Sequence, residues 1–568
     1  MNTLVLTILA IAGYILAYRL YGRFIGARLF RLSSSNPMPS HTLRDGIDYE
    51  PAKKNIIFGH HFTTIAGLGP IVGPAIGIIW GWLPAFIWIF IGSIFMGAVH
   101  DFTTLVVSAR NEGKTIGELT GRYVSPQARI VFQMIMQLLL FIVLAVFAAI
   151  VSTLFLMYPE SVIPVWFQIP IAIWLGYEIR RGKNDLVYSI IAVALMYASI
   201  LLGVYLPVSL PFEADTSVVV WCVILFVYVF FASTLPVYRL LQPRDYINSH
   251  QLLLAMGLMV TGLIIAHPPL SAPAINQLAF KEGSDVPALA PVMFIIIACG
   301  AISGFHALAS SGTTVKQVDK ENDTLFIAYG GMLTESFLAV LVLMAIAGGL
   351  GIGMESEGVV LTGSDAFYKH YSSWASADGL GAKLGAFITG TANLYQSFGI
   401  PPALGAPMIA VFIVSFANTT LDSAARIQRL SLQEIFRDKD GKTRKPINNR
   451  YFSTFIIVLV AAIMTFLKPG GQGAMVLWPL FGSLNQLMAA LALGVVTIYL
   501  HLKKKNILFT LLPMLFVLFI TLWAMLENLF RYYKDKDIVL VVLSVVIILF
   551  TLLLIFSGVK ALLGKISS

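Results

Sequence analysis

The chain is long and strongly apolar. It has 568 residues, of which 58% are hydrophobic and 12% are charged, and its mean hydropathy is +0.83. A soluble globular protein carries roughly 25% charged residues, so the composition excludes that class and indicates an integral membrane protein with many spans. The net charge of +9 fits arginines and lysines in cytoplasmic loops, and it does not imply a nucleic-acid partner.

Apolar segments long enough to cross a hydrocarbon core of ~30 Å recur along the whole chain. We expect an all-α polytopic protein with about fifteen transmembrane helices. In chain order these are 2–22, 56–80, 82–108, 129–157, 162–178, 185–208, 218–238, 247–267, 290–312, 324–350, 403–422, 452–467, 476–500, 507–526 and 537–560. Cys222 and Cys299 lie inside apolar runs and are interpreted as small hydrophobic residues.

Basic residues alternate between loops and so predict the topology. Seven arginines and lysines between Arg19 and Lys54 place the first loop in the cytoplasm, and therefore the N-terminus outside. Later loops, including one that holds Arg244, continue the alternation and leave the C-terminus inside. The segment 383–398 breaks it, because a crossing there would put the basic loop from Arg426 to Arg450 outside. We expect this segment to be re-entrant or interfacial, and a short true span is the alternative.

A short motif occurs twice. "GHHFTTIAG" begins at Gly59 and "GFHALASSG" begins at Gly304, and both read G-x-H-x(5)-G. The second copy lies seven crossings after the first, so the two copies point in opposite directions through the membrane. Transporters with such inverted repeats bind their substrates near the midplane, where two broken helices face a cavity. We therefore expect both helices to be interrupted, antiparallel and in contact at a central polar cavity.

Three longer blocks carry a resemblance to a known family. "YEPAKKNIIFGHHFTTIAGLGPIVGPAIG" from Tyr49, "ACGAISGFHALASSGTT" from Ala298 and "NTTLDSAARIQR" from Asn418 resemble the carbon starvation protein A (CstA) family. The resemblance implies an inner-membrane transporter of peptides, or in some members of pyruvate, with the leucine-transporter fold of the APC superfamily. One transporter domain, 1–568, would then contain a first repeat with extra helices at 56–267, a second inverted repeat at 290–500 and two accessory helices at 507–560.

The repeated motif supplies the candidate substrate site. Its residues, with neighbours of the two breaks, are Gly59, His60, His61, Gly67, Gly69, Gly304, Phe305, His306, Ser310, Ser311 and Gly312. His61 and His306 occupy the repeated position, and an imidazole suits both proton coupling and recognition of a carboxylate. The alternative is a neutral imidazole bonded to a helix carbonyl. A metal site is disfavoured, because adjacent histidines on a helix diverge by ~100°, and we expect no cofactor.

Two acids within spans are candidates for proton coupling alongside His61 and His306. Asp101 follows His100 toward the cytoplasmic end of 82–108, and Glu335 lies deep in 324–350. An acid in the membrane costs about 2.5 to 3.5 kcal/mol on insertion scales and normally has a partner or a function. The alternatives are a structural salt bridge, for instance from Asp101 to Arg110, and a packing role for Glu335.

Hydroxyls and a carboxylate gather near the end of 403–422. Thr419, Thr420 and Asp422 offer the oxygen ligands that a hard cation prefers. The resemblance to the leucine-transporter fold implies a sodium site on the equivalent helix, facing the first broken helix. The alternative is a helix end in which Asp422 pairs with Arg426, four residues further on.

The function that fits best is secondary active transport of small carboxylate-bearing nutrients, most simply peptides, with proton coupling. Pyruvate/proton symport is the alternative. An intramembrane enzyme is disfavoured, because H-E-x-x-H and G-x-S-x-G motifs are absent from the sequence, and a channel is disfavoured by the paired broken helices. The expected partners are the small-molecule substrate, a coupling cation and membrane lipid, in the inner membrane of a bacterium.

Overall fold

Most of the chain is helical. The structure, a computed structural model, describes residues 2–378, 380–437 and 445–564. Two short strands, β1 (Met354–Ser356) and β2 (Val359–Leu361), form an antiparallel hairpin. The helices of the first half are α1 (Thr3–Ala17, continued by π-helical turns to Phe30), α2 (Pro39–Thr42), α3 (Lys54–Ile65), α4 (Gly69–Gly77), α5 (Trp82–Gly92), α6 (Ala98–Ala109), α7 (Ile116–Tyr123), α8 (Pro126–Met157), α9 (Val162–Arg180), α10 (Asp185–Tyr205), α11 (Ala214–Thr234) and α12 (Leu241–Ala266).

The second half contains both long and short helices. They are α13 (Leu289–Ile296), α14 (Ala298–Ala301), α15 (Gly304–Gly312), α16 (Gly331–Met344), α17 (Gly363–His370), α18 (Trp374–Asp378), α19 (Leu380–Gln396), α20 (Pro402–Ile435), α21 (Arg450–Phe466), α22 (Gln472–Val476), α23 (Trp478–Leu502), α24 (Leu508–Lys534) and α25 (Ile538–Leu563).

Twelve candidate spans are long and apolar enough to cross a membrane, and the bent pair of α3 and α4 raises the number to as many as thirteen. All of the predicted spans are helical, but two of them fall short of this length. One is α21, which has 17 residues, and the other is 289–312, which is divided among α13, α14 and α15. Twelve or thirteen of the fifteen expected spans therefore qualify by length and composition, and whether α21 and the broken segment 289–312 also cross stays a prediction.

The first broken helix changes direction between α3 and α4. The chain bends by 44° there, and Ala66 leaves the helical region with ψ of 47°. Small residues allow close approach at the break: a Cβ on Gly69 would overlap Sγ of Cys299, and a Cβ on Gly73 would lie 2.7 Å from the carbonyl oxygen of Ile296. The interruption predicted for this helix is confirmed.

The second broken helix is interrupted before its histidine motif. Ile297 and Ile302 leave the helical conformation, and Ser303 is extended. The stretch from Gly304 to Gly312 is then one regular helix, α15. The interruption predicted for this helix is also confirmed, and it lies on the N-terminal side of Gly304.

Contacts at both ends show that the two broken helices are antiparallel. Beyond the end of the first, the indole of Trp80 donates a hydrogen bond of 2.9 Å to the carbonyl of Pro287, which precedes the second. At the other end, the amide of Glu50 donates to the carbonyl of Lys316 at 3.1 Å. The start of each helix therefore lies beside the end of the other.

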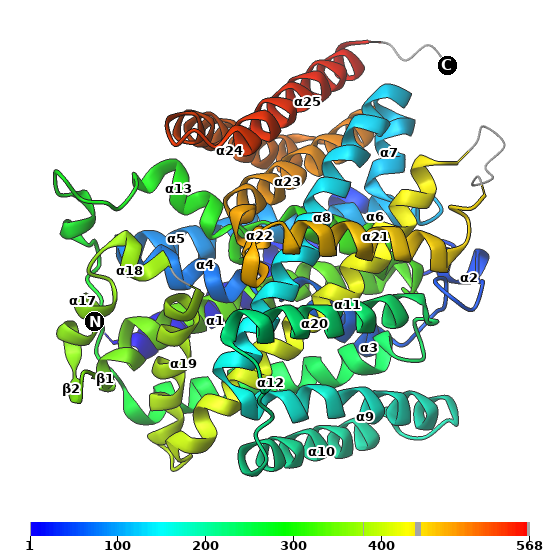
Figure 1. Cartoon of the computed structure of the whole chain (residues 1–568). Helices are drawn as coiled ribbons and strands as arrows, with labels where there is room; N and C mark the ends of the chain where they lie inside the picture. The colour runs from blue at the N-terminus through cyan, green and yellow to red at the C-terminus, as the bar shows by residue number, and fades with distance from the viewer. Residues whose placement is uncertain (1, 379, 438–444, 565–568) are drawn as a thin grey trace.

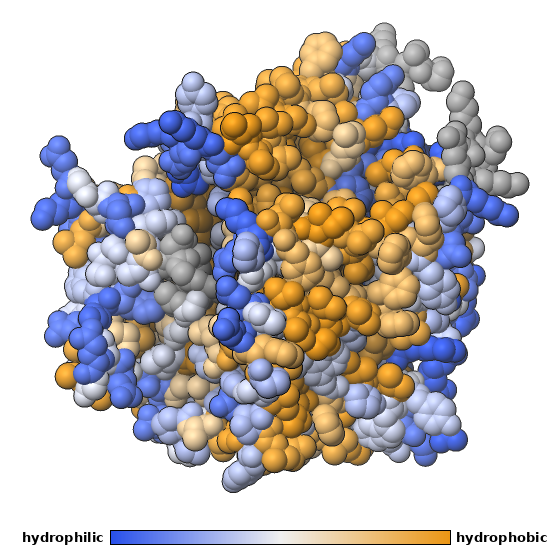
Figure 2. All heavy atoms as spheres, viewed as in Figure 1, coloured by the Kyte–Doolittle hydropathy of each residue, from blue (hydrophilic) through white to orange (hydrophobic). Residues whose placement is uncertain are grey.

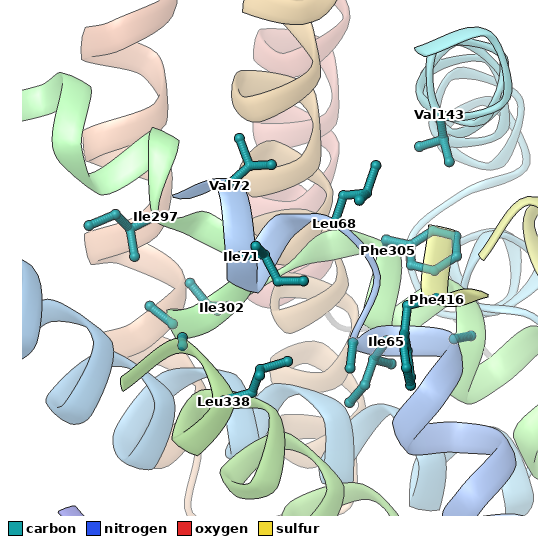
Figure 3. Close-up of a cluster of buried hydrophobic side chains, with 14 of the residues drawn as sticks. Ile65, Leu68, Ile71, Val72, Val143, Ile297, Ile302, Phe305, Leu338 and Phe416 are labelled. Atoms are coloured by element: carbon teal, nitrogen blue, oxygen red, sulfur yellow. The ribbon is translucent and has the colours of Figure 1, made fainter. Parts of the chain in front are cut away.

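Apolar side chains fill the space around the two breaks (Figure 3). The cluster combines residues of the first broken helix with residues of the second, and α8, α16 and α20 complete it. The labelled members are Ile65, Leu68, Ile71, Val72, Val143, Ile297, Ile302, Phe305, Leu338 and Phe416, and all are at most 5% exposed. Burial on this scale fixes the two breaks against each other.

One predicted boundary was wrong. The span predicted at 403–422 continues as α20 to Ile435, so the supposed basic loop from Arg426 begins as a buried helix. Arg426 is 1% exposed and Arg429 is 4% exposed. The span was predicted to end before these arginines because a hydropathy scale treats every charged side chain as exposed to water. Both arginines are instead buried and paired with Asp48. Residues 438–444 of the same predicted loop lie outside the described residues.

The long helices run mainly from left to right in Figure 1. The N-terminal end of α1 lies on the left near α17 and the hairpin, and α2 and α7 lie on the right. Apolar side chains cover the middle of the face seen in Figure 2, with polar side chains toward both ends. α19 covers most of the segment 383–398 and is not among the candidate spans. Its re-entrant or interfacial character stays a prediction.

The predicted topology is testable with single cysteines on a background of Cys222→Ala and Cys299→Ser. Ser284→Cys and Ser35→Cys place thiols at exposed positions of two loops. We expect an impermeant maleimide to label Ser284→Cys in intact cells, and to label Ser35→Cys only after permeabilisation, because the positive residues retain their loop in the cytoplasm. Labelling of Ser35→Cys from outside would contradict the topology.

Candidate functional site

A cluster of histidines and carboxylates is buried in the protein interior. His306 contacts Asp101 through Nδ1 at 2.9 Å from Oδ2 and contacts Glu335 through Nε2 at 3.3 Å from Oε2. His100 Nδ1 lies 2.8 Å from the other oxygen of Asp101. All four side chains are 0% exposed. The alternative of a salt bridge from Asp101 to Arg110 is wrong, because Arg110 pairs with Glu321 at 2.6 Å.

Three helices hold this cluster: α6 carries Asp101, α15 carries His306 and α16 carries Glu335. The break in the second broken helix determines where α15 begins. The side-chain oxygen of Asn485, on α23, accepts hydrogen bonds from the Phe305 amide at 2.9 Å and from the Ser303 hydroxyl at 3.1 Å. It thereby satisfies one of the amides left free at the start of the helix. A Cβ on Gly304 would overlap the α23 backbone.

The cluster can store a proton. With both carboxylates ionised and His306 protonated, the group carries a net charge of −1, and one further proton neutralises it. Apart from the 3.3 Å contact with His306, neither oxygen of Glu335 has a hydrogen-bond donor within the described part of the chain. An unsolvated carboxylate beside one shared imidazolium is costly in a low-dielectric interior, so the position of a single proton changes the energy of the whole group.

His60 and His61 point to different partners. His60 Nδ1 lies 2.5 Å from Oδ2 of Asp245 on α12, and His61 Nδ1 lies 3.0 Å from the Thr314 hydroxyl. Nε2 of each has no hydrogen-bond partner among the described residues. His61 thus contacts the segment that follows α15, and a Cβ on Gly331 would lie 3.1 Å from its ring. The role of His61 in substrate binding stays a prediction.

Two of the three predicted cation ligands on α20, Thr419 and Asp422, already contact an internal cation. Arg244, on α12, forms an ion pair with Asp422 and donates to the Thr419 hydroxyl at 3.1 Å. Tyr228 donates to the same carboxylate at 2.8 Å. Two predictions were wrong here: Asp422 does not pair with Arg426, and Arg244 is not a loop residue but is 2% exposed inside α12.

The other residues of this segment contact the first broken helix. The hydroxyls of Thr64 and Ser423 lie 3.2 Å apart. The hydroxyl of Thr420 donates to the Phe416 carbonyl at 3.1 Å and lies 3.5 Å from the Thr64 carbonyl. A Cβ on Gly67 would lie 2.6 Å from that hydroxyl. The predicted proximity of α20 to the first broken helix is confirmed.

The remaining candidate residues have mainly packing contacts. Gly59 lies against Ser249, and Gly312 lies against Ile427. The Ser311 hydroxyl accepts a hydrogen bond from the Ile116 amide at 3.1 Å. Ser310 has a buried hydroxyl without a partner in the described structure, and its role in substrate binding stays a prediction.

A cavity of about 160 Å³ touches both broken helices. Gly69 and Gly73 line it from the first, Cys299 lines it from the second, and Asn485 and Arg531 contribute polar groups from α23 and α24. The histidines of the motif do not line this cavity. Sequence reasoning missed Asn485, although the polar pair Asn-Gln within the apolar run "SLNQLMAA" was a usable signal.

A second charge group joins the ends of both broken helices. Asp48, just before α3, lies 2.7 Å from Arg426 and 3.2 Å from Arg429. Burial disfavours the charged carboxylate, but Arg429, Arg426 and the buried Lys316 outweigh it and hold the pKa of Asp48 well below its usual range. This group connects α20 with the segments that precede α3 and follow α15.

A multi-pass helical protein in which two interrupted helices meet among buried ionisable side chains has the architecture of a membrane transporter. Comparison with known proteins gives the family. The chain matches "Carbon starvation protein CstA" over residues 2–524 and belongs to that family. The family is one of transporters, not of enzymes.

Several named relatives are similar over most of their length. The peptide transporter CstA of Mycobacterium tuberculosis is 32% identical, with 93% of this chain and 76% of the relative covered. The peptide transporter CstA of Escherichia coli is 32% identical, with 89% and 78% covered. The pyruvate/proton symporter BtsT of Escherichia coli is also 32% identical, with 93% and 82% covered.

Solved structures show a more distant likeness. A manganese transporter of Eremococcus coleocola has a TM-score of 0.47 at 12% identity, with 89% of this chain and 95% of the other covered. MhsT in complex with L-phenylalanine has a TM-score of 0.47 at 13% identity, with 84% and 98% covered.

The Asp48 group makes a prediction for stability. A carboxylate whose pKa is depressed in the folded state stabilises it at every pH above its unfolded pKa of about 3.9, and that stabilisation is lost as pH falls toward the folded value. Asp48→Asn leaves two buried arginines without their partner, and we expect it to cost about 3 kcal/mol at pH 7. The readout is the melting temperature in detergent from pH 7 to pH 3, and the deficit of the variant should shrink below about pH 4.

Glu50→Gln is the matched control. Glu50 pairs with Arg44 at 2.6 Å, but Arg44 is 59% exposed, so water and salt replace the lost partner. We expect little change in its melting temperature. A deficit for Asp48→Asn that stays constant down to pH 3 would contradict the ionic origin of the effect.

Proposed function

We propose that the protein is a secondary active transporter that imports small carboxylate-bearing nutrients, with peptides as the first candidates, and that inward proton movement drives it. The membrane would be the inner membrane of a bacterium, with the N-terminus outside and the C-terminus in the cytoplasm. Residues 56–267 would form a first repeat with extra helices, 290–500 a second inverted repeat and 507–560 two accessory helices. The antiparallel contact of the two broken helices supports this division.

The buried cluster of His306, Asp101 and Glu335 carries the proposal of proton coupling. Ionisable side chains at membrane depth are costly, and they mark proton relays or substrate paths more often than structural positions. Here one imidazole lies between carboxylates from two different helices, and each carboxylate competes for the same proton. A movement of α15 relative to α6 or α16 changes which carboxylate holds it, which links proton transfer to a conformational change.

The contacts of Arg244 argue against sodium as the coupling ion. The hydroxyl of Thr419 and the carboxylate of Asp422 suit a hard cation, but the guanidinium of Arg244 already contacts both. A bound sodium ion would have to displace an arginine that has no water to solvate it. A proton needs no empty cation site, because it binds directly to a side chain such as His306 or Glu335.

The names of the relatives limit the class of substrate. Two are named peptide transporters and one a pyruvate/proton symporter. Peptides and pyruvate share a carboxylate, and a carboxylate suits the imidazoles and the freed backbone amides near the two breaks. His61 and His306 are the proposed ligands, with the glycines of the motif providing access. Pyruvate/proton symport is the second candidate.

The test is uptake into proteoliposomes that contain the purified protein. We expect labelled dipeptide to accumulate when an inward proton gradient is imposed and not when only a sodium gradient is imposed. Labelled pyruvate in parallel vesicles distinguishes the two substrate candidates. Accumulation driven by sodium alone at constant pH would contradict proton coupling, and release of a hydrolysed product would contradict transport of the intact nutrient.

Substitutions separate proton coupling from substrate binding. We expect His306→Ala or His61→Ala to lower uptake by about tenfold or more, because loss of one partner of a buried charged contact costs ~2 kcal/mol or more. His61→Gln keeps a hydrogen-bond donor but cannot titrate, so it should retain affinity in calorimetry better than proton-driven accumulation. Glu335→Gln should likewise retain substrate exchange between equal concentrations while losing accumulation.

Thr551→Val is the matched control for these buried substitutions. Thr551 is 0% exposed on α25, and its hydroxyl contacts only a backbone carbonyl of its own helix in the described structure. We expect normal uptake from this variant. If both alanine variants accumulate substrate at wild-type rates with unchanged pH dependence, the two histidines are structural.

A further inference from the structure

A basic pocket lies away from the two broken helices. Its cavity of about 640 Å³ lies between the end of the first span, the end of α6 and the segment that joins α23 to α24. Its charged lining residues are Arg31, Arg110, Glu112, Glu321, Lys503 and Lys505. All of its elements belong to loops or helix ends that the distribution of basic residues assigns to the cytoplasmic side.

The acids of this pocket are already neutralised. Glu321 pairs with Arg110 at 2.6 Å, and Glu112 pairs with Lys114 at 3.0 Å. Within the described part of the chain, the other three cations, Arg31, Lys503 and Lys505, have no carboxylate at ion-pair distance. The pocket therefore presents three uncompensated positive charges to whatever enters it.

An apolar seam leads from the membrane to this pocket. On α1, Leu20 is 62% exposed and Phe24 is 46% exposed, and on α24 Leu512 is 61% exposed. Phe509, near the start of α24, joins the two helices: its ring lies 5.6 Å from that of Phe24 and 6.0 Å from that of Tyr21. Aromatic rings in this position mark the level at which lipid headgroups meet the acyl chains.

We propose that the basic pocket binds the phosphate headgroup of an anionic phospholipid whose acyl chains lie along the seam between α1 and α24. The cations lie where the seam ends, so one molecule with a charged head and apolar tails satisfies both features. A free phosphate would use the charges but not the exposed leucines. Cationic pockets at the cytoplasmic ends of membrane helices hold lipid headgroups in this way.

The test is lipid binding to the purified full-length protein, measured by native mass spectrometry after delipidation. The probes are phosphatidylglycerol, phosphatidylcholine and inorganic phosphate. We expect phosphatidylglycerol to bind most tightly. The triple variant Arg31→Gln, Lys503→Gln and Lys505→Gln should bind it more weakly by about fivefold per charge removed, with its melting temperature in lipid-free detergent unchanged.

A charge-matched triple variant is the control. Arg181→Gln, Lys183→Gln and Arg239→Gln remove three cations from other loops of the same predicted side, and we expect unchanged phosphatidylglycerol affinity. Three outcomes would overturn the proposal: equal binding of phosphatidylglycerol and phosphatidylcholine, equal losses in both triple variants, or inorganic phosphate that displaces phosphatidylglycerol at similar concentrations. The last would assign the pocket to a soluble anion.

Discussion

The close contact between the two broken helices is the constraint on which the rest of the structure depends. A helix interrupted at membrane depth exposes amides and carbonyls that hydrocarbon cannot satisfy. Here each break is covered by the other: Gly69 lies against Cys299, and Gly73 lies against the carbonyl of Ile296. Asn485 then accepts hydrogen bonds from the Phe305 amide, at the start of α15, and from the Ser303 hydroxyl. Larger side chains at these glycines would separate the breaks and expose their backbone.

The position of the buried charges follows from this contact. Because α15 begins at the second break, His306 lies in its first turn and faces α6 and α16 rather than lipid. The first broken helix in turn brings Thr64 to α20 and His61 to Thr314. Each polar group thus has partners on elements that are distant in sequence. A displacement of either broken helix would exchange these partners, which is the property that a transporter with alternating access needs.

The sequence was sufficient for the apolar spans, both interruptions and the histidines that accompany them, because periodic hydropathy and glycine spacing are local signals. It was insufficient for Arg244 and Arg426, which hydropathy placed in loops. Each arginine is buried because of an acid far along the chain: Asp422 is 178 residues from Arg244, and Asp48 is 378 residues from Arg426. The residues next to each arginine give no sign of a partner so far along the chain. Predicted span boundaries are therefore wrong where a charged side chain is buried in an ion pair rather than exposed to water.

Three charge groups would have different roles in the proposed transport cycle. Arg244 and Asp422 form a pair without a vacancy, and breaking it would leave two buried charges, so it suits a fixed joint between α12 and α20. His306 shares its contacts between two carboxylates and can lose either without leaving both acids unpaired. Asp48, by contrast, lies just before the first broken helix, so a movement of that helix away from α20 would break its contacts with Arg426 and Arg429. Under the proposed function, the fixed contact, the proton site and the contact that must open would therefore belong to different residues. A conformational change could then move His306 and Asp48 while the pair of Arg244 and Asp422 stays intact.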